Sequence, residues 1–481
     1  MKFIIKLFPE ILLKSRSVRK RMGLQLQRNL RRVMRNIDDE IEVFRYWDKL
    51  EIICGENIHE KVRDVLGRTP GIDQYLQVNE YPLTDLQRIA EQVGEVFLEK
   101  IPGKTFAVRC KRSGKHGFTS MDVDRYVGGY LFKRGNPKSV NLKNPDVKIE
   151  LEIHQDQVNI VIARYRGIGG YPLGTQEACL SLMSGGFDST VASYETIKRG
   201  VITHFLFFNL GGKAHEIGVK QVAFYLWKKY AASHPVKFTT VSFESVVAEL
   251  LNSVSDGYMG VVLKRLMLRA GEKIAEQMKI DALVTGESIA QVSSQTLRNL
   301  SLIDQATNKM VIRPLVTKHK QEIIATASKI GTREFAENMP EYCGVISRKP
   351  VIYALADRLD EEESKFNYSV FDEAVDNAVS MSIEQVIKDV NQHAEVETVS
   401  DPDNAIVIDI RRTEEHEKDP LDLEPSRQLA ISFAEINHRF SSLDQSQEYL
   451  LYCDQGVMSQ LHAQYLRDAG FNNVRVYRPP E

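Results

Sequence analysis

Two short loops carry residues whose types and spacing suit chemistry. One reads SGGFDS over 184–189 and follows an apolar segment that predicts a strand at 179–183. The other reads CDQGVMS over 453–459 and follows a second apolar segment at 449–453. A glycine-rich loop that enters a helix presents backbone N–H groups to a phosphate, and a cysteine before a helix amino terminus is a candidate thiolate. The sequence therefore predicts a nucleotide phosphate site and a reactive sulfur site.

The first loop has the composition of an anion site. Gly185 and Gly186 allow close approach of the backbone, and Ser184 and Ser189 add hydroxyl donors. The carboxylate of Asp188 would repel a phosphate, so we expect it to hold the loop or a Mg²⁺ that bridges the nucleotide. An ordinary strand-to-helix turn can also read SGG. The full hexapeptide is more specific, because it resembles the PP-loop of ATP pyrophosphatases, which adenylate an oxygen, and lacks the Walker lysine.

The second loop favours a nucleophilic sulfur at Cys453. An ordinary thiol titrates near pH ~8.5, and a helix amino terminus lowers that pKa by favouring the anion. The loop resembles the active-site loop of rhodaneses, and Asp409-Ile410-Arg411 resembles their early Asp-x-Arg strand end. Many rhodaneses have an arginine where Met458 stands, which favours a protein persulfide over free thiosulfate as the donor. The alternative for Cys453 is a buried strand cysteine.

The other cysteines give weaker signals. Cys343 lies in PEYCGV, where a core or loop cysteine is the default interpretation, and Cys54, Cys110 and Cys179 lie in apolar segments that predict structural roles. Five widely spaced cysteines without a Cys-x-x-Cys pair argue against a disulfide framework or a zinc site, so no metal-ligating residues are predicted. A reducing cytoplasm suits such a chain.

Length and composition indicate a globular protein of several domains. A chain of 481 residues is expected to form about three or four domains. Its content of 43% hydrophobic and 27% charged residues is typical of globular proteins and does not favour a fibrous or disordered class. The start, MKFIIKLFPEILLK, is too charged for a signal peptide, and no run approaches the roughly 18 apolar residues of a membrane span. We therefore expect no membrane partner.

The charge is divided unevenly along the chain. The formal net charge is −2, yet residues 1–35 hold eleven Lys or Arg against Glu10 alone, and residues 100–143 hold eleven against Asp122 and Asp124. Neutralising phosphates releases condensed counterions, so a polyanion is attracted to such stretches. Solvated charge is the alternative, but we favour nucleic-acid contact.

The first third of the chain predicts two α+β modules. An opening strand at 3–7 precedes a helix with an inward stripe of Val18, Met22, Leu26, Leu30, Val33 and Ile37 and with its basic residues on the opposite face. Strands are expected at 106–110, 147–153 and 158–163. Four glycines and a proline over 167–174 then mark a domain boundary.

The remainder predicts two α/β domains. Apolar strands alternate with helices from residue 178, which favours a doubly wound parallel sheet whose ligands bind beyond the carboxyl ends of its strands. The expected strands are 179–183, 202–209, 238–243, 282–285 and 311–314. Acidic helices and a linker near 394–404 follow. A last unit of about 80 residues has strands at 405–411, 449–453 and 473–477 and a helix at 457–469.

Taken in order, these segments resemble the bacterial tRNA 4-thiouridine synthetases, the tRNA sulfurtransferases that carry a carboxy-terminal rhodanese domain. The resemblance covers nearly the whole chain. Besides the two loops it rests on MKFIIKLFPE, KRSGKHGFTSMDVDRYVGG, FFNLGGKAHEIGV, VTGESIAQVSSQTLRNL and MPEYCGVIS.

The resemblance implies a multidomain α/β and α+β fold. It places a ferredoxin-like domain at 1–60, a THUMP RNA-binding domain at 61–165, a PP-loop adenylation domain at 175–393 and a rhodanese domain at 402–481. By motif, the implied ATP contacts are Leu182, Met183, Ser184, Gly185, Gly186, Ser189, Lys264, Gly286 and Gln295. Asp188 joins Cys453 and Cys343 as an implied catalytic residue.

The implied reaction thiolates the uridine at position 8 of tRNA with ATP and Mg²⁺. The uridine C4 oxygen attacks the α-phosphate and pyrophosphate leaves; Cys453, loaded as a persulfide by a cysteine desulfurase, then delivers sulfur and AMP departs. Cys343 would end in a disulfide with Cys453, which a thiol reductant resets. The same persulfide would supply the thiazole of thiamine through a sulfur carrier protein.

Three alternatives explain less of the sequence. A PP-loop ligase or amidotransferase for a small molecule leaves both basic stretches and Cys453 unexplained. A non-catalytic RNA-binding protein would need a vestigial phosphate loop, yet Gly185, Gly186 and Asp188 are intact. A sulfur carrier for thiamine synthesis alone needs only the last domain.

Overall fold

The computed structural model describes residues 1–210, 212–337, 339, 347–386, 396–411, 413–432, 435–436, 439–453 and 457–479. The chain separates into two compact units. The first unit comprises 1–175 with 198–200, and the second comprises 176–197 with 201–481.

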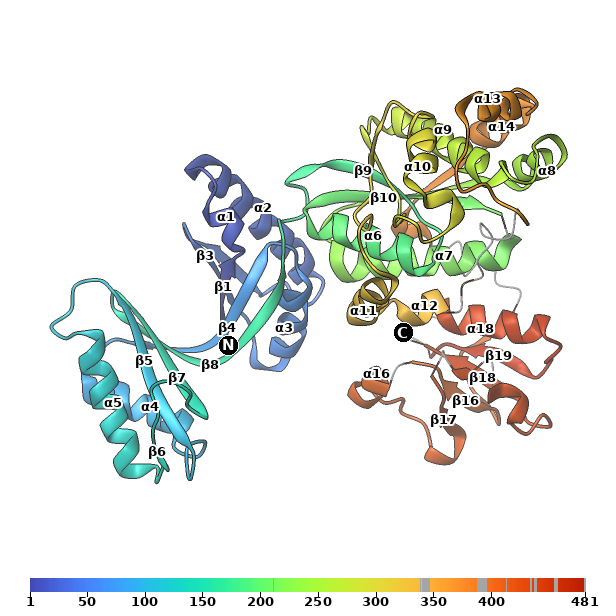
Figure 1. Ribbon diagram of the computed structural model, residues 1–481. Helices are drawn as coiled ribbons and strands as arrows, with labels where there is room; N and C mark the ends of the chain where they lie inside the picture. The colour runs from blue at the N-terminus through green and yellow to red at the C-terminus, as the bar shows by residue number, and fades with distance from the viewer. Residues whose placement is uncertain are drawn as a thin grey trace. The chain divides into compact units, whose positions relative to one another are not determined.

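The first unit is built on one mixed sheet of eight strands in the order β2-β3-β1-β4-β8-β7-β5-β6. The long antiparallel pair β4 and β8 joins its two halves, so the two predicted α+β modules share a continuous sheet (Figure 1). The strands are β1 (Lys2–Leu7), β2 (Glu42–Arg45), β3 (Lys49–Ile53), β4 (Ile72–Pro82), β5 (Thr105–Ser113), β6 (Ser139–Val140), β7 (Val147–His154) and β8 (Gln157–Gly169).

Strand β4 is absent from the sequence-based expectation for a physical reason. Its pairing register shifts between Ile72 and Gln74 and again between Gln77 and Val78. Such irregularities break the period-two alternation by which a half-buried strand is recognised.

Helices cover this sheet over two separate cores. Helix α2 (Arg16–Arg35) buries Met22, Leu26 and Leu30 of the predicted stripe, and also Met34, in a core shared with β1. The other members of the stripe, Val18, Val33 and Ile37, are partly buried against this core. The helices α1 (Pro9–Leu12) and α3 (His59–Arg68) complete this core. Over the other half, α4 (Leu86–Phe97) and α5 (Ser120–Arg134) enclose a second core.

The second unit contains the predicted doubly wound sheet. Six strands run in the order β13-β12-β9-β10-β11-β14, and all neighbours are parallel except β14 on β11. The strands are β9 (Gln176–Leu182), β10 (Val201–Asn209), β11 (Lys237–Ser242), β12 (Ala282–Val284), β13 (Met310–Ile312) and β14 (Val379–Ser382). The helices are α6 (Phe187–Lys198), α7 (Gly212–Leu226), α8 (Glu244–Ser253), α9 (Met259–Met278), α10 (Leu297–Asp304), α11 (Lys320–Ile330) and α12 (Arg333–Glu337).

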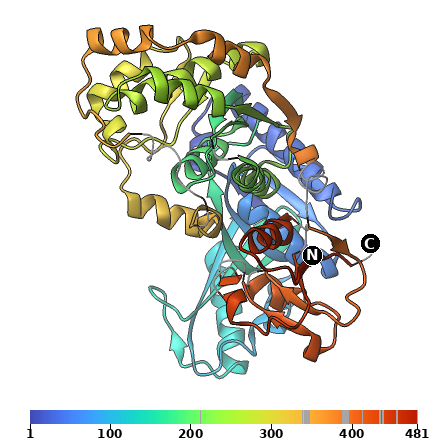
Figure 2. The same cartoon turned by 90° about the vertical axis from the view of Figure 1, so that its right-hand side faces the viewer.

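The predicted acidic helices are α13 (Ala356–Ser364) and α14 (Tyr368–Asp376), which lie beside α8 and α9 in both views (Figures 1 and 2). Buried Glu363 accepts hydrogen bonds from Arg265 and Arg269 of α9. An acidic helix thus docks on a basic side of α9 through a buried ion cluster.

The tail forms a third, wholly parallel sheet in the order β15-β19-β18-β16-β17. Its strands are β15 (Thr398–Val399), β16 (Ile406–Asp409), β17 (Gln428–Ala430), β18 (Tyr449–Tyr452) and β19 (Val474–Tyr477). Helices α16 (Thr413–Lys418) and α18 (Val457–Asp468) accompany them over a small apolar core. No helix in the described ranges combines the length and hydrophobicity needed to cross a bilayer.

Candidate active site

Both predicted sites occur where the strand order of a parallel sheet reverses. From β9 the chain proceeds to β10 and β11 on one side of the sheet, whereas β12 and β13 lie on the other side. The loops after β9 and β12 therefore diverge from adjacent strands at their carboxyl ends. In open α/β sheets this is where ligands bind.

The loop after β9 is closed by its own serines. The hydroxyl of Ser189 accepts a hydrogen bond from the backbone N–H of Ser184 at 3.1 Å and lies 3.0 Å from the Ser184 hydroxyl. It also donates to the carbonyl oxygen of Gly186 at 3.3 Å. Ser189, in the first turn of α6, thus fixes the backbone of the loop that connects β9 to this helix.

Two positions in this region require glycine, Gly185 because of its positive φ and Gly286 because of close packing on backbone atoms. Gly185 has φ +82°, and a Cβ on it would lie 2.6 Å from the Cε atom of Met339. A Cβ on Gly286, just after β12, would lie 2.5 Å from the carbonyl carbon of Asp188 and 2.6 Å from the nitrogen of Ser189. Gly286 therefore lets the loop after β12 pack directly on the backbone of the phosphate loop.

Asp188 ties three segments together. Its Oδ1 accepts a hydrogen bond from Lys320 Nζ at 2.9 Å, and its Oδ2 accepts one from Gln291 Nε2 at 2.7 Å. Lys320 begins α11, and Gln291 lies in the loop after β12. Asp188 thus links the loop after β9 to α11 and to the loop after β12, and it brings Lys320, which the sequence does not reveal, to the edge of the phosphate loop.

A buried carboxylate fixes the predicted phosphate-binding lysine. Glu287 Oε1 accepts from Lys264 Nζ of α9 at 2.6 Å, and Glu287 Oε2 accepts from Arg313 Nε at 2.8 Å. Arg313 follows β13 and also pairs with Asp304 of α10. Burial alone would raise the pKa of Glu287, but the charges of Lys264 and Arg313 outweigh it and lower that pKa to about 2.

The remaining predicted ATP contacts border the same loops. Leu182 ends β9, and the N–H of buried Met183 donates to the carbonyl oxygen of Leu206 on β10 at 2.8 Å. The side-chain Oε1 of Gln295 accepts from the N–H of Ser288 at 3.3 Å. All the predicted ATP contacts thus lie on or beside the loops after β9 and β12.

The predicted sulfur site lies at the corresponding point of the tail sheet. From β16 the chain adds β17 on one side, whereas β18 and β19 lie on the other. Cys453 directly follows β18, and its half-buried Sγ accepts from the N–H of Ser459 at 3.3 Å and lies 3.5 Å from the Ser459 hydroxyl. Ser459 is in the first turn of α18, so the amino terminus of this helix faces the sulfur.

The Asp-x-Arg segment lies beside Cys453 in the same sheet. Asp409 pairs in register with Tyr452, and the N–H of Ile410 donates to the carbonyl oxygen of Tyr452 at 3.0 Å. The buried Asp409 carboxylate accepts from Arg411 Nη2 at 2.7 Å and contacts His416 Nδ1 at 2.9 Å. Burial raises the pKa of Asp409, but these hydrogen bonds outweigh it and keep the pKa below its usual range.

Three other cysteines lie in or directly after strands: Cys54 follows β3, and Cys110 and Cys179 lie in β5 and β9. Burial raises the pKa of Cys54, and raises the pKa of Cys110 and Cys179 to about 12, which agrees with structural roles. The prediction for Cys343 lies outside the described residues. Among those residues, no group of three or more His, Cys, Asp or Glu side chains is arranged to hold a metal ion.

The side chains that reach the two loops from elsewhere in the chain were not predicted from the sequence. Lys320 is 132 residues from its partner Asp188, and Arg313 is 26 residues from Glu287. Glu287 could have been identified from the sequence, because it stands next to Gly286 just after a predicted strand, where ligands of a parallel sheet bind. A lone lysine at the start of a helix carries no such signal.

Comparison with known families divides the chain into three matched regions. Residues 174–368 match the family described as thiamine biosynthesis protein (ThiI), residues 84–163 match the THUMP domain, and residues 392–478 match the rhodanese-like domain. Together with the three sheets, these matches confirm the predicted fold class.

Curated relatives match over the full length. A tRNA sulfurtransferase of Pseudomonas putida is 51% identical over 483 residues and covers 100% of both chains. One from Escherichia coli is 48% identical over 482 residues, again with 100% of both chains covered.

Solved structures agree. A 4-thiouridine synthetase, determined as an RNA complex with bound ATP, matches 79% of this chain and 99% of its own, with a TM-score of 0.70 and 27% identity. A Pyrococcus horikoshii protein matches 69% of this chain and all of its own at a TM-score of 0.54 and 19% identity, which supports the fold alone. With half of its residues identical to such relatives over the entire length, this chain belongs to the tRNA sulfurtransferase family and is an enzyme of that class.

Proposed function

We propose that this sulfurtransferase converts the uridine at position 8 of tRNA to 4-thiouridine, by adenylation at the phosphate loop followed by sulfur delivery from Cys453. The observation that carries the proposal is the packing of Gly286 on the backbone of Asp188 and Ser189. This contact brings an anion-binding loop, Lys264 and Lys320 to one edge of the sheet, where a triphosphate is complemented by amides and cations.

The proposed ATP site uses the residues around that contact. The amides of the loop and the Ser184 and Ser189 hydroxyls bind phosphate oxygens, while Lys264 supplies positive charge. The related 4-thiouridine synthetase was solved with ATP bound, which supports the same ligand here. The proposed contacts are Leu182, Met183, Ser184, Gly185, Gly186, Ser189, Lys264, Gly286 and Gln295.

Asp188 fits a magnesium ion held jointly with the nucleotide. Mg²⁺ is commonly bound through one or two carboxylates plus substrate phosphates, and Asp188 supplies one carboxylate at the mouth of the loop. Bound there, the ion would neutralise phosphate charge. Lys320 and Gln291 orient this carboxylate through the hydrogen bonds that they donate to it.

In the adenylation step, the uridine O4 attacks the α-phosphorus of ATP, the bond from that phosphorus to the oxygen shared with the β-phosphate breaks, and the N3 proton of the uridine passes to solvent. The loop amides stabilise the charge that develops on the α-phosphate, and pyrophosphate leaves. The O4 atom, a poor leaving group as an oxide, then departs as part of AMP. The chain's task in this step is to place the two reactants in line and to hold the charge.

In the sulfur step, the outer sulfur of a persulfide on Cys453 attacks C4 of the activated uridine, and AMP leaves with the former O4. We propose that Cys343 attacks the Cys453 sulfur, so that the S–S bond breaks, the thiouridine keeps the outer sulfur and a Cys343–Cys453 disulfide forms. Two electrons from a thiol reductant then restore both thiols. The Ser459 amide and the helix amino terminus support an anionic sulfur at Cys453.

The proposed RNA surface is the amino-terminal third. In this proposal two domains hold tRNA, a ferredoxin-like domain at 1–60 and a THUMP domain at 61–165. The adenylation domain is at 175–393, and the rhodanese domain that carries the sulfur is at 402–481. The exposed basic residues of α2 support this division, because they can neutralise phosphates: Arg16, Lys20, Arg21, Arg28, Arg31, Arg32 and Arg35. RNA in the related synthetase complex supports the same class of partner.

The remaining partners follow from the sulfur chemistry. We propose a cysteine desulfurase as the persulfide donor and a thiol reductant for resetting, both in a reducing cytoplasm. The family match described as thiamine biosynthesis protein favours a second role, in which Cys453 supplies sulfur to a carrier protein for the thiazole of thiamine.

Mass spectrometry of tRNA nucleosides tests the central proposal. Cells that lack this protein should contain no 4-thiouridine at position 8, and expression of the chain should restore it. Restoration by an Asp188→Ala chain, or a full level of 4-thiouridine without any chain, would contradict the proposal.

A further inference from the structure

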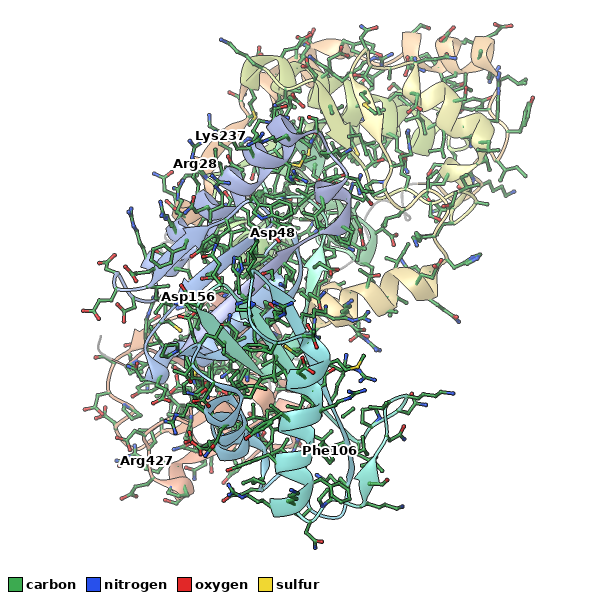
Figure 3. The ribbon with its side chains drawn as sticks, turned by 90° about the vertical axis from the view of Figure 1, so that its left-hand side faces the viewer. Arg28, Asp48, Phe106, Asp156, Lys237 and Arg427 are labelled. Atoms are coloured by element: carbon green, nitrogen blue, oxygen red, sulfur yellow. The ribbon has the colours of Figure 1, made fainter. Side chains whose placement is uncertain are left out.

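An exposed tryptophan stands at the tip of the hairpin formed by β2 and β3. Trp47 is 71% exposed, and its neighbour Tyr46 is 45% exposed. Figure 3 labels Asp48, the next residue in this turn, and Arg28 on α2. A large aromatic ring is normally buried for most of its surface, as Trp227 is at 8% exposure. The turn therefore presents a ring that remains mostly outside the packed core.

The hairpin is fastened along α2, which fixes the position of this ring. The carbonyl oxygen of Val43 in β2 accepts from Gln27 Nε2 at 3.0 Å and from Arg31 Nη2 at 2.9 Å. One turn earlier in the helix, a Cβ on Gly23 would lie 3.5 Å from Cδ of Arg45. Strand β2 thus runs antiparallel to α2 and carries its turn towards the first residues of the helix.

A cation lies over the ring at this end of α2. The guanidinium carbon of Arg19 is 5.4 Å from the centroid of the Trp47 ring, within cation–π range. One cation can cover only one face of a ring, and the high exposure of Trp47 leaves surface for a second planar group. Arg16 and Lys20, both exposed, flank Arg19 on the helix.

This combination matches the chemistry of an unpaired nucleotide. A base stacks on an aromatic face, while its phosphates are neutralised by neighbouring cations. Bases in an RNA double helix are stacked on each other and cannot reach such a ring, whereas unpaired bases can. The local charge of residues 1–35, eleven Lys or Arg against one Glu, suits a polyanion.

We propose that Trp47 and Arg19 form a stacking site for one unpaired nucleotide of the RNA substrate. This inference rests on the proposed action of the chain on tRNA and assigns a contact within it. The stacked base sets the register of the RNA along α2, while the arginines supply affinity that does not depend on register.

The chain's two tryptophans make a direct optical test possible. In the full-length Trp227→Phe chain, Trp47 is the sole indole, and its emission should be quenched on titration with unmodified tRNA. A blunt RNA duplex of equal phosphate concentration should bind through α2 with little quenching. Equal quenching by the duplex, or tRNA binding without quenching, would overturn the proposal. So would a response confined to anionic lipid vesicles, which would assign the ring to a membrane surface.

Binding measurements separate stacking from charge. Trp47→Ala should weaken tRNA affinity by about 5- to 150-fold with an unchanged slope against salt, and Trp47→Phe should restore most of the affinity. Leu251→Ala, at a 52% exposed apolar residue of α8, is the matched control and should bind normally. If Trp47→Ala bound tRNA with unaltered affinity while the wild-type chain still formed 4-thiouridine, the stacking site alone would be overturned. Absence of 4-thiouridine with wild-type chain would instead overturn the proposed function.

Discussion

The sheet that holds the phosphate loop and the sheet that holds Cys453 share one plan and differ in how they treat charge. Each places its loop at the point where the strand order reverses, and each buries a carboxylate near the end of a neighbouring strand. Glu287 holds Lys264 and Arg313, and Asp409 holds Arg411 and His416. The two sites are therefore variants of one solution to positioning cations beside a loop.

The difference lies in whether the cation remains accessible. The Lys264 side chain keeps 21% of its surface exposed, whereas Arg411 keeps 3% and also donates to the carbonyl oxygen of Asp419 at 2.8 Å. Lys264 can thus serve a substrate phosphate, while Arg411 is engaged in holding its strand end. The sulfur instead receives a backbone N–H from Ser459. Side-chain cations therefore border the loop after β9, whereas a backbone N–H of a helix contacts the sulfur of Cys453.

The largest effect is expected at Asp188. Asp188→Ala should lower pyrophosphate release by about 100- to 1000-fold, because the loop loses the carboxylate that Lys320 and Gln291 orient. Loading of a persulfide on Cys453 should persist, since the tail sheet builds its own site. Adenylation is checked by measuring pyrophosphate release, and persulfide loading by mass spectrometry of the peptide that contains Cys453. Simultaneous loss of loading would show that the two sites do not work separately.

A smaller effect is expected at Glu287, with Glu363 as its matched control. Both are buried carboxylates that accept from side chains of α9, and those side chains are on adjacent residues, Lys264 and Arg265. Replacing either by Gln should cost about 3–5 kcal/mol of stability, because buried cations lose their partner. Only Glu287→Gln should also lower kcat/KM for ATP, by about 10- to 150-fold. In a Lys264→Met chain, Glu287→Gln should lower kcat/KM for ATP little further. If Glu363→Gln and Glu287→Gln lowered kcat/KM equally, the role of Glu287 would be purely structural.

The same variant has a predicted pH dependence. The folded-state pKa of Glu287 is depressed to about 2 from an ordinary value of 4.5, so its charged form stabilises the fold above that ordinary value. This contribution is lost as the pH falls from 4.5 towards 2. The Tm difference between wild type and Glu287→Gln should be constant from about pH 8 to 6 and shrink below about pH 4.5. A difference that grows on acidification would contradict the ionised assignment.

How far these sites could be predicted depends on where their parts lie in the chain. The loop at 184–189 is contiguous, so its hexapeptide predicts the strand, the turn and the helix that follow. Gly286 and Gln295 were reached only through family resemblance, and the ligand roles of all these residues stay predictions. Lys320 and Arg313 both follow β13, and they meet carboxylates that follow β9 and β12 only because β13, β12 and β9 are neighbours in the folded sheet.

The fold was predictable where a strand is either a continuous apolar run or a regular alternation of apolar and polar residues. Five of the six strands of the doubly wound sheet were expected within a few residues of their observed ends, because each is an apolar run between polar loops. The sixth, the antiparallel edge strand β14, was not expected, because it has four residues and none of them is buried. Strand β4 was not predicted, because two register shifts disturb its pattern. Strands β15 and β17 were not predicted, because they have only two and three residues. Short or irregular strands are stabilised by their neighbours, which a linear pattern does not reveal.

The smallest effect is expected at Ser459. Ser459→Ala keeps the backbone N–H that donates to the Cys453 sulfur and removes only a hydroxyl 3.5 Å away. Sulfur transfer should fall by at most about threefold, because sulfur is a weak hydrogen-bonding partner. Persulfide transfer measured with a fixed donor checks this. A loss of about 100-fold would show that the hydroxyl, rather than the helix amides, serves the sulfur.

The division of labour between the two sheets is tested most directly in a single reaction of the Cys453→Ser chain with unmodified tRNA, ATP and a sulfur donor. Pyrophosphate release and 4-thiouridine are measured in the same sample. We predict that the first turnover of pyrophosphate release is retained at the wild-type rate while 4-thiouridine is absent. Formation of 4-thiouridine at the wild-type rate would contradict the role of Cys453 as the sulfur donor.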